Sequence, residues 1–320
     1  MMASRTIADE GEFGLIAQVT AGLTMPDAVT VGPGDDCAVF APFGQVVVST
    51  DAMHEDVHFK KVWSGPHDVG RKAVGAALAD VEAMGATPLG VVVALSAPEE
   101  TPTEWVLEFS RGVRDECGLG GAALIGGDTT RGAVIGIVVT AFGDLQGRAP
   151  VLRSGARVGD VVAFTGRLGM AAAGLAVLGR GFRSPGAVVR AHRVPEVPYG
   201  QGRAAAEAGA SALVDCSDGL LADLGHVARA SGVAIDLDSA TLDVDEAQKT
   251  VAAAIGGGDP LHYILTGGDD HALLGTFAAS DVPEGWTVIG RVLPLEPDAG
   301  ASVTVDGKVW SGDAGGWRHF

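Results

Sequence analysis

The sequence has few cysteines, few aromatic residues and a minority of basic residues. Its 320 residues include three cysteines, and aromatic residues make up 5% of the chain. Cys37, Cys117 and Cys216 are widely spaced and form no CxxC pair, which argues against a zinc site or a thioredoxin-like motif. An odd number of scattered thiols is typical of a reducing compartment, so we expect a cytoplasmic protein. The 22 basic residues stand against 40 acidic ones, and the net charge of -18 argues against nucleic acid or an anionic membrane as partner.

Several common sequence signals are also missing. No apolar run approaches the length of a membrane span, and residues 1–14 lack the hydrophobic core of a signal peptide. The single Gly-Lys pair, at Gly307, is followed by valine, so there is no Walker loop. There is likewise no HRD or DFG kinase motif and no GxSxG. If this chain binds ATP, it must do so through a different scaffold.

The arrangement of apolar segments predicts a two-domain α/β fold with α+β layers. Hydrophobic residues make up 47% of the chain, enough for a large core. Predicted strands and helices such as Asp68–Gly85 alternate, but with hairpins, which favours a mixed sheet over a purely parallel one. One such hairpin is predicted between the strand near Phe40 and the strand Gln45–Thr50. The composition changes around Gly143–Gly159. We therefore expect an N-terminal mixed sheet with helices in residues 1–148 and a C-terminal α/β domain in residues 149–320.

The segment Leu124–Gly132, with the sequence Leu-Ile-Gly-Gly-Asp-Thr-Thr-Arg-Gly, is the most informative stretch. Its apolar run predicts a strand that ends at Ile125 and opens into a loop. A glycine such as Gly127 lets the backbone approach a bulky ligand. Asp128 is suited to a hard cation, and Arg131 is suited to a phosphate. Alone this is an ordinary loop, so the interpretation depends on similar loops elsewhere.

Carboxylates recur at predicted strand ends or on a helix face of small residues. They are Asp36, Asp51, Asp80, Asp128 and the pair Asp215 and Asp218. Each has an ordinary explanation: Gly-Asp is turn chemistry, Ser217 and Asp218 are suited to cap a helix, and Asp80 is within reach of Arg71 or Lys72. Together with flanking hydroxyls, however, the acids outnumber what turns require. Clustered carboxylates repel unless cations neutralise them, and oxygen ligands without His or Cys favour Mg²⁺ or Ca²⁺.

The order of these motifs resembles the thiamine-monophosphate kinase family, in the superfamily of aminoimidazole ribonucleotide synthetase. The resemblance covers nearly the whole chain. It rests on Gly34-Asp-Asp-Cys-Ala38, Ser49-Thr-Asp51, Asp80 within Ala79–Ala86, Ile125-Gly-Gly-Asp-Thr-Thr-Arg131, Arg153-Ser-Gly155, Asp215-Cys-Ser-Asp-Gly-Leu220, Thr266-Gly-Gly-Asp-Asp270 and the aromatic tail near Trp317.

The resemblance implies a homodimer that transfers the γ-phosphoryl group of ATP to thiamine monophosphate, with several Mg²⁺ ions. Residues 1–148 would then bind metal and ATP and form the dimer, and residues 149–320 would complete the site. The implied metal ligands are Asp36, Ser49, Thr50, Asp51, Asp80, Asp128, Asp215 and Asp218. The implied ATP contacts are Gly127, Asp128, Arg153 and Ser217, and the implied substrate contacts are His58, Asp269 and Trp317.

The acceptor phosphate has a second pKa of about 6, so no general base is needed and no catalytic residue is assigned. One motif departs from the family pattern. Where the family often has Gly-Gly-Glu-Asp-Tyr-Glu, this chain has Gly-Gly-Asp-Asp-His-Ala, ending at Ala272. Asp269 reaches less far than glutamate, and His271 suits a structural role as well as a ligand role.

Two alternatives remain. The first is another ATP-dependent synthetase of the same superfamily. A selenophosphate synthetase would require a reactive cysteine on a glycine-rich N-terminal segment, which this sequence lacks. The second is a non-catalytic protein that binds nucleotides or divalent cations, in which the arginines and the substrate-side residues would have no role.

Overall fold

The structure is a computed structural model, and it divides the chain into two units that are each built on a β-sheet. It describes residues 5–256, 258–296 and 300–311. Unit 1 comprises Met1–Val81 and Thr87–Gly147, and unit 2 comprises Glu82–Ala86 and Arg148–Phe320. Mixed sheets with helices in both units confirm the predicted α/β class. Within the described ranges, no helix is long and apolar enough to cross a membrane.

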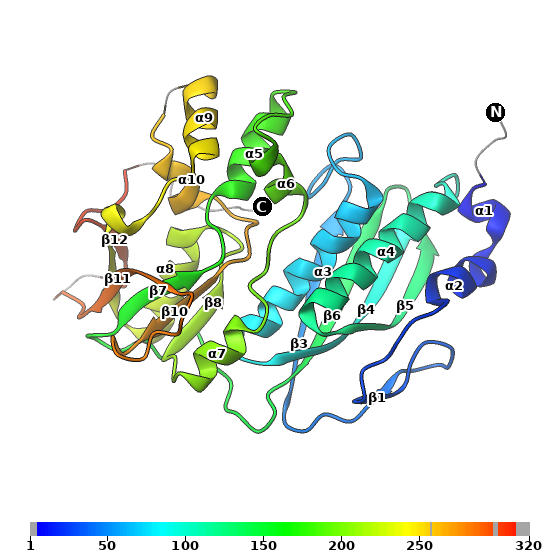
Figure 1. Cartoon of the computed structure of the whole chain (residues 1–320), viewed down its shortest axis with the longest axis horizontal. Helices are drawn as coiled ribbons and strands as arrows, with labels where there is room; N and C mark the ends of the chain where they lie inside the picture. The colour runs from blue at the N-terminus through cyan, green and yellow to red at the C-terminus, as the bar shows by residue number, and fades with distance from the viewer. Residues whose placement is uncertain (1–4, 257, 297–299, 312–320) are drawn as a thin grey trace. The chain divides into compact units, whose positions relative to one another are not determined.

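Unit 1 is built on a four-stranded sheet with the strand order β3-β6-β4-β5. β6 pairs antiparallel with both β3 and β4, and β4 pairs parallel with β5. Two long helices, α3 and α4, run along one face of the sheet (Figure 1). The elements are α1 (Ile7–Glu10), α2 (Glu12–Thr20), β1 (Val29–Val31), β2 (Val39–Phe40), β3 (Val46–His54), α3 (Pro66–Ala83), β4 (Thr87–Ala97), α4 (Thr103–Gly120), β5 (Ala123–Arg131) and β6 (Gly136–Asp144).

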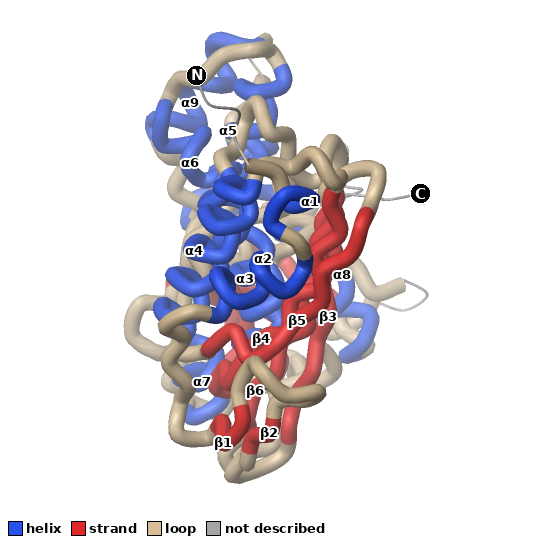
Figure 2. The backbone as a smooth tube through the Cα atoms, turned by 90° about the vertical axis from the view of Figure 1, so that its right-hand side faces the viewer, coloured by secondary structure: helices blue, strands red, loops and turns tan. Residues whose placement is uncertain are grey.

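The opposite face of the unit 1 sheet carries no helix of unit 1 (Figure 2). Met53, Val93 and Val139 are buried toward α3 and α4, whereas their neighbours along each strand are more exposed. Because successive strand side chains point to opposite faces, the exposed set shares the face away from the helices. We call this surface the open face. Its exposed residues include Val46, Val48, Thr50, Ala94, Asp128 and Val138.

Two local predictions for unit 1 are wrong. The segment from Gly126 to Arg131 is not a loop, because β5 continues to Arg131 and pairs with β4 along its whole length. The register shifts between Val91 and Val92, so β5 passes this point with an irregularity and still remains a strand. The predicted hairpin between the strand near Phe40 and Gln45–Thr50 is also absent, because β2 pairs with β1 and β3 pairs with β6.

Unit 2 contains a six-stranded sheet with the strand order β12-β9-β11-β7-β10-β8. All pairs are antiparallel except β12 with β9. β8 is an edge strand, and the buried side chains of α8 pack with it in the main core of this unit. The strands are β7 (Val161–Thr165), β8 (Ala212–Asp215), β9 (Ala234–Leu237), β10 (Leu273–Phe277), β11 (Thr287–Leu293) and β12 (Val303–Val305). The helices are α5 (Met170–Gly179), α6 (Gly186–Arg193), α7 (Gln201–Glu207), α8 (Leu220–Ser231), the 3-10 turn η1 (Ser239–Thr241), α9 (Glu246–Ile255) and α10 (Leu261–Thr266).

Candidate active site

Asp80 on α3 has a hydrogen-bond donor from the neighbouring strand. Ser49 Oγ, on β3, donates to Asp80 Oδ2 at 2.5 Å. The side chain of Asp51 leaves β3 on the same face as that of Ser49. Of the two cations predicted as alternative partners of Asp80, Arg71 binds another acid, since its Nε donates to Glu116 Oε2 at 2.8 Å. Three of the predicted metal ligands therefore lie on the helix-covered face of the sheet, at its β3 edge.

Thr50 and Asp128 lie on the open face instead. Thr50 Oγ1 lies 3.1 Å from Thr140 Oγ1, and Asp128 pairs with Ala94 across β5 and β4. β3 and β5 are the two edges of the sheet, separated by three strand spacings, or about 14 Å. The carboxylates of Asp51 and Asp128 also leave the sheet on opposite faces. Within unit 1, the predicted ligands on β3 and β5 therefore do not form a single cluster.

Gly127 is required by the pairing of the strands themselves. A Cβ atom built there would lie 2.3 Å from the carbonyl oxygen of Val93 on β4. Any larger residue would therefore push β5 away from β4. The sequence predicted that this glycine admits a ligand. The structure adds a second requirement, the close approach of the two backbones.

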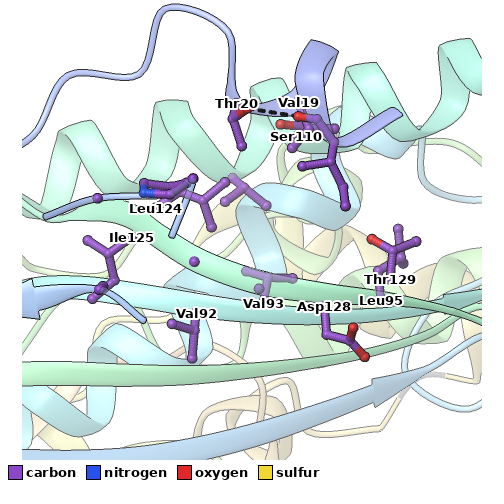
Figure 3. Close-up of a pocket in the computed structure, with 18 of the residues that line it drawn as sticks. Val19, Thr20, Val92, Val93, Leu95, Ser110, Leu124, Ile125, Asp128 and Thr129 are labelled. Atoms are coloured by element: carbon purple, nitrogen blue, oxygen red, sulfur yellow. Dashed lines mark hydrogen bonds between the residues drawn. The ribbon is translucent and has the colours of Figure 1, made fainter. Parts of the chain in front are cut away.

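A cavity of about 820 Å³ lies beside Asp128 in unit 1. Its polar residues include Asp35, Asp36 and Asp128, and its apolar lining comes from α2, α4 and the sheet. Figure 3 shows Val19 and Ser110 on one side of the cavity, and Val93 on the sheet side. Asp35 Oδ1 accepts a hydrogen bond from the Asp36 amide at 2.8 Å, so these two acids belong to one turn. Asp36 and Asp128 thus line the same cavity.

In unit 2 two segments that are far apart in sequence are joined by backbone hydrogen bonds. The Asp269 amide donates to Ser217 O at 2.8 Å, and the His271 amide donates to Cys216 O at 3.0 Å. A Cβ atom at Gly268 would lie 2.2 Å from Ser217 O, so this approach needs glycine. The segment Asp215–Asp218 and the segment Gly267–His271 therefore lie side by side, which brings together the backbones that carry Asp215, Ser217, Asp218 and Asp269.

The helix-capping explanation of Ser217 and Asp218 is wrong. The N-cap of α8 is Gly219, with φ at +128°, and it makes no side-chain cap. Asp223 reaches back instead, and its Oδ2 accepts from the amides of Asp218 and Gly219, each at 3.0 Å. Asp223 was missed by the sequence reasoning. Its spacing of four residues after Gly219 is the signal that would have indicated it.

The acids around the start of α8 repel one another. Burial, and then the charge of Asp215, raise the pKa of Asp223 to about 7. Ligand atoms of Asp218, Asp223 and His226 lie within 4.8 Å of one another. A divalent cation would relieve this repulsion, and the oxygen atoms of Asp215 and Asp218 suit Mg²⁺. The residues of unit 2 therefore fit the metal that the sequence predicts.

The remaining predicted site residues are more scattered. Arg153 is exposed; burial first, and then the charges of Arg229 and Arg153, lower the pKa of His226, whereas the charge of Asp218 raises it. His58 follows β3 in unit 1, and its Nδ1 accepts from the amide of His54 at 3.0 Å. Trp317 lies outside the described residues.

Asp270 is a buried carboxyl group beside this site. Its Oδ1 accepts from the Ala171 amide at 2.9 Å, at the start of α5. Its Oδ2 has no hydrogen-bond partner among the described residues. Burial raises the pKa of Asp270 from the ordinary 3.8 to about 7. Between about pH 4 and pH 7, the carboxyl group of Asp270 is therefore protonated in the folded protein and ionised in the unfolded chain.

We expect Asp270→Asn to remove the pH dependence that this carboxyl group contributes, while the contribution of Asp223, whose pKa is also raised to about 7, remains. In the native protein the free energy of unfolding should fall as the pH rises from about 4 to about 7, and then level off. Asparagine carries no charge, so the variant should gain stability relative to the native protein between about pH 5 and pH 8. The gain should be at most about 4 kcal/mol, at about 1.4 kcal/mol per pKa unit. Thermal unfolding of the variant and the native protein at about pH 5 and about pH 8, without divalent metal, measures this gain in stability. The exposed Asp281→Asn is the control, and an equal difference at both pH values would contradict the prediction.

The chain matches two family descriptions along most of its length. The N-terminal domain of AIR synthase related protein matches residues 34–145, and the C-terminal domain matches residues 157–296. The thiamine-monophosphate kinase of Mycobacterium tuberculosis is 48% identical over 318 residues, covering 99% of this chain and 94% of that protein. The chain belongs to the thiamine-monophosphate kinase family. The thiamine-monophosphate kinase of Corynebacterium glutamicum is 40% identical over 327 residues, covering 98% of this chain and 95% of that protein.

Solved structures of thiamine-monophosphate kinases share the fold. That of Stenotrophomonas maltophilia aligns with a TM-score of 0.77 and 34% identity, covering 92% of this chain and 95% of that one. AaThiL complexed with AMPPCP and TMP aligns with a TM-score of 0.77 and 32% identity, over 100% of both chains. Membership of the thiamine-monophosphate kinase family makes this chain an enzyme, and it confirms the resemblance drawn from the ordered motifs.

Proposed function

We propose that this chain transfers the γ-phosphoryl group of ATP directly to thiamine monophosphate and so forms thiamine diphosphate. The observation that carries the proposal is the likeness to thiamine-monophosphate kinases over 99% of the chain. A relative of the same fold binds AMPPCP and TMP. Each unit also contains carboxylates and glycines of the kind that such a transfer needs, which supports the proposal.

The chemistry requires positioning and charge neutralisation more than proton transfer. The acceptor is a phosphate monoester with a second pKa of about 6, so at neutral pH it is already a nucleophile. Two polyanions must approach each other in line, on a protein whose net charge is -18. When bound, Mg²⁺ supplies the positive charge that offsets this repulsion. The implied residues that would hold it are Asp36, Ser49, Thr50, Asp51, Asp80 and Asp128 in unit 1, and Asp215 and Asp218 in unit 2.

The cavity beside Asp128 supports a place for the nucleotide. Its apolar lining suits a purine base, and its polar residues Asp36 and Asp128 suit the metal-bound phosphates. Gly127 also lines it, so no side chain of that residue obstructs a phosphate. Arg153 and Ser217 in unit 2 are the remaining proposed ATP contacts. On the acceptor side, Asp269 and Trp317 suit the cationic thiazolium ring, and His58 suits its phosphate.

We also propose a homodimer formed through the open face. Val46, Val48 and Val138 are 38%, 60% and 38% exposed, so this sheet presents apolar side chains to solvent. Exposed apolar patches of this kind are covered in many proteins by another subunit. The occupant that we propose is a second copy of this chain, as the family resemblance implies. Cytoplasmic location stays a prediction, supported by three free cysteines, of which Cys117 and Cys216 are buried.

A panel of acceptors tests the proposed function against both alternatives. The full-length protein with ATP and Mg²⁺ should release ADP when thiamine monophosphate is added. Thiamine should not support release above the rate without acceptor, because its hydroxyl would need a general base. ADP release with another acceptor but not with thiamine monophosphate would favour a synthetase. Binding of ATP without any ADP release would favour the non-catalytic alternative.

A further inference from the structure

The imidazole ring of His271 lies between two carboxylates of the candidate site. Its Nδ1 is 3.1 Å from Asp215 Oδ2, and its Nε2 is 3.8 Å from Asp269 Oδ1. The side chains of His271 and Asp215 are 7% and 4% exposed, whereas that of Asp269 is 37% exposed. Of these two contacts, the one with Asp215 is within hydrogen-bond distance. His271 therefore holds Asp215 more firmly than it holds Asp269.

The backbone fixes the ring in this place. Asp269 and His271 have φ values of 69° and 54°, in the left-handed region that few non-glycine residues adopt. The His271 amide binds Cys216 O, and the Cys216 amide binds Ala272 O at 2.8 Å. Strained conformations of this kind persist where the surrounding structure determines them, and they concentrate at functional sites. The backbone of His271 and Ala272 is thus fixed to that of Cys216, the residue after Asp215, and this places the ring beside Asp215.

The contact also fixes which atoms remain available. A carboxylate can only accept, so Nδ1 carries the proton and donates to Asp215 Oδ2. This hydrogen bond orients the carboxylate group and leaves Asp215 Oδ1 for another partner. Carboxylates that bind metals commonly accept a hydrogen bond from a neighbouring residue that does not touch the metal. This neighbouring residue orients the carboxylate and affects its affinity for the ion. The second acid, Asp269, has His192 Nδ1 on its other side at 3.9 Å, again beyond hydrogen-bond distance.

We propose that His271 is a positioning residue that orients Asp215 for binding a divalent cation. The proposal rests on the proposed function, in which Asp215 is a metal ligand. It gives a role to a residue at which the sequence departs from the family motif. It also predicts that Nδ1 is the ring nitrogen that matters for Asp215, because Nδ1 makes the hydrogen bond to this carboxylate.

The experiment compares His271→Ala, His271→Asn and His271→Gln. The amide nitrogen of asparagine stands near the position of Nδ1, and that of glutamine stands near the position of Nε2. Asparagine also tolerates the positive φ at this position. Mn²⁺ is titrated into the full-length protein without nucleotide, and free Mn²⁺ is measured by electron paramagnetic resonance. We expect alanine to weaken Mn²⁺ binding about 10- to 100-fold. Asparagine should restore it to within about threefold, and glutamine should not.

Thr276→Val is the control for a purely structural effect. Thr276 is 1% exposed on β10, and its Oγ1 lies 2.6 Å from Ser211 Oγ. The control should lower the melting temperature without changing Mn²⁺ binding. If alanine prevents folding, the comparison of asparagine with glutamine decides the question. If the native protein binds Mn²⁺ and the His271→Gln and His271→Ala variants bind it equally well, His271 does not orient Asp215. The proposed function would then still stand. Native protein without any Mn²⁺ binding would contradict the metal assignment and this inference together.

Discussion

Replacing Asp128 by asparagine is expected to lower kcat about a thousandfold without unfolding the protein. A metal-held charge contributes several kcal/mol to phosphoryl transfer, and each 1.4 kcal/mol is tenfold in rate. Asp128 is exposed on β5 and lines the cavity proposed for the nucleotide. Asparagine keeps its size but loses the charge that holds the ion. Steady-state turnover with ATP, Mg²⁺ and thiamine monophosphate, together with the melting temperature, measures the effect.

Asp115→Asn is the matched control for the loss of a carboxylate. Asp115 lies on α4, its side chain is 64% exposed, and it pairs with His67 Nε2 at 2.8 Å. Exposed pairs of this kind contribute about 0–1 kcal/mol, so its loss should leave both stability and turnover nearly unchanged. Native turnover in the Asp128→Asn variant would remove Asp128 from the metal site. An equal fall in turnover in the Asp128→Asn and Asp115→Asn variants would show a general effect of charge.

Placing a charge on the open face by Val48→Asp is expected to convert the proposed dimer into a monomer. Val48 is 60% exposed in the single chain, and a dimer through this face would bury it. Burying an unpaired carboxylate costs about 3–5 kcal/mol, which weakens association about a hundredfold or more. Light scattering after size exclusion, at protein concentrations in the micromolar range, measures the mass.

The control for this experiment is Val309→Asp. Val309 is 77% exposed in unit 2 and does not belong to the open face. This variant should remain a dimer at the same concentrations. A Val48→Asp protein that stays dimeric would place the interface elsewhere. A native protein that is monomeric would contradict the proposed dimer itself.

Local patterns predicted much of the fold. The predicted strand Gln45–Thr50 overlaps β3 along nearly all of its length, and the helix carrying Asp80 begins within two residues of its predicted start at Asp68. The extent of β5 could not be predicted in this way. Gly126–Arg131 looks like a loop in sequence, because two glycines and polar residues weaken a strand. It remains extended because β4 supplies a paired backbone up to Ala97, a contact that no local pattern contains.

The grouping of the predicted site residues was easier to predict in unit 2 than in unit 1. Asp215, Ser217, Asp218 and Asp269 were expected together, and backbone hydrogen bonds join their two segments. The acids of unit 1 divide between two faces, because Asp51 and Asp128 stand on different edges of a sheet whose order is β3-β6-β4-β5. That order depends on which strands pair, and spacing in the sequence does not give it. Asp223 and the contact of His271 with Asp215 likewise required the folded arrangement.

In the proposed function, the γ-phosphoryl group of ATP passes to thiamine monophosphate. The most direct test is to incubate the protein with Mg²⁺, thiamine monophosphate and ATP labelled in the γ-phosphoryl group, and then to separate the products. The proposed function predicts that the label appears in thiamine diphosphate, in its terminal phosphoryl group, in equal amount to the ADP formed. Label found in inorganic phosphate alone, with ADP formed but no thiamine diphosphate, would contradict it.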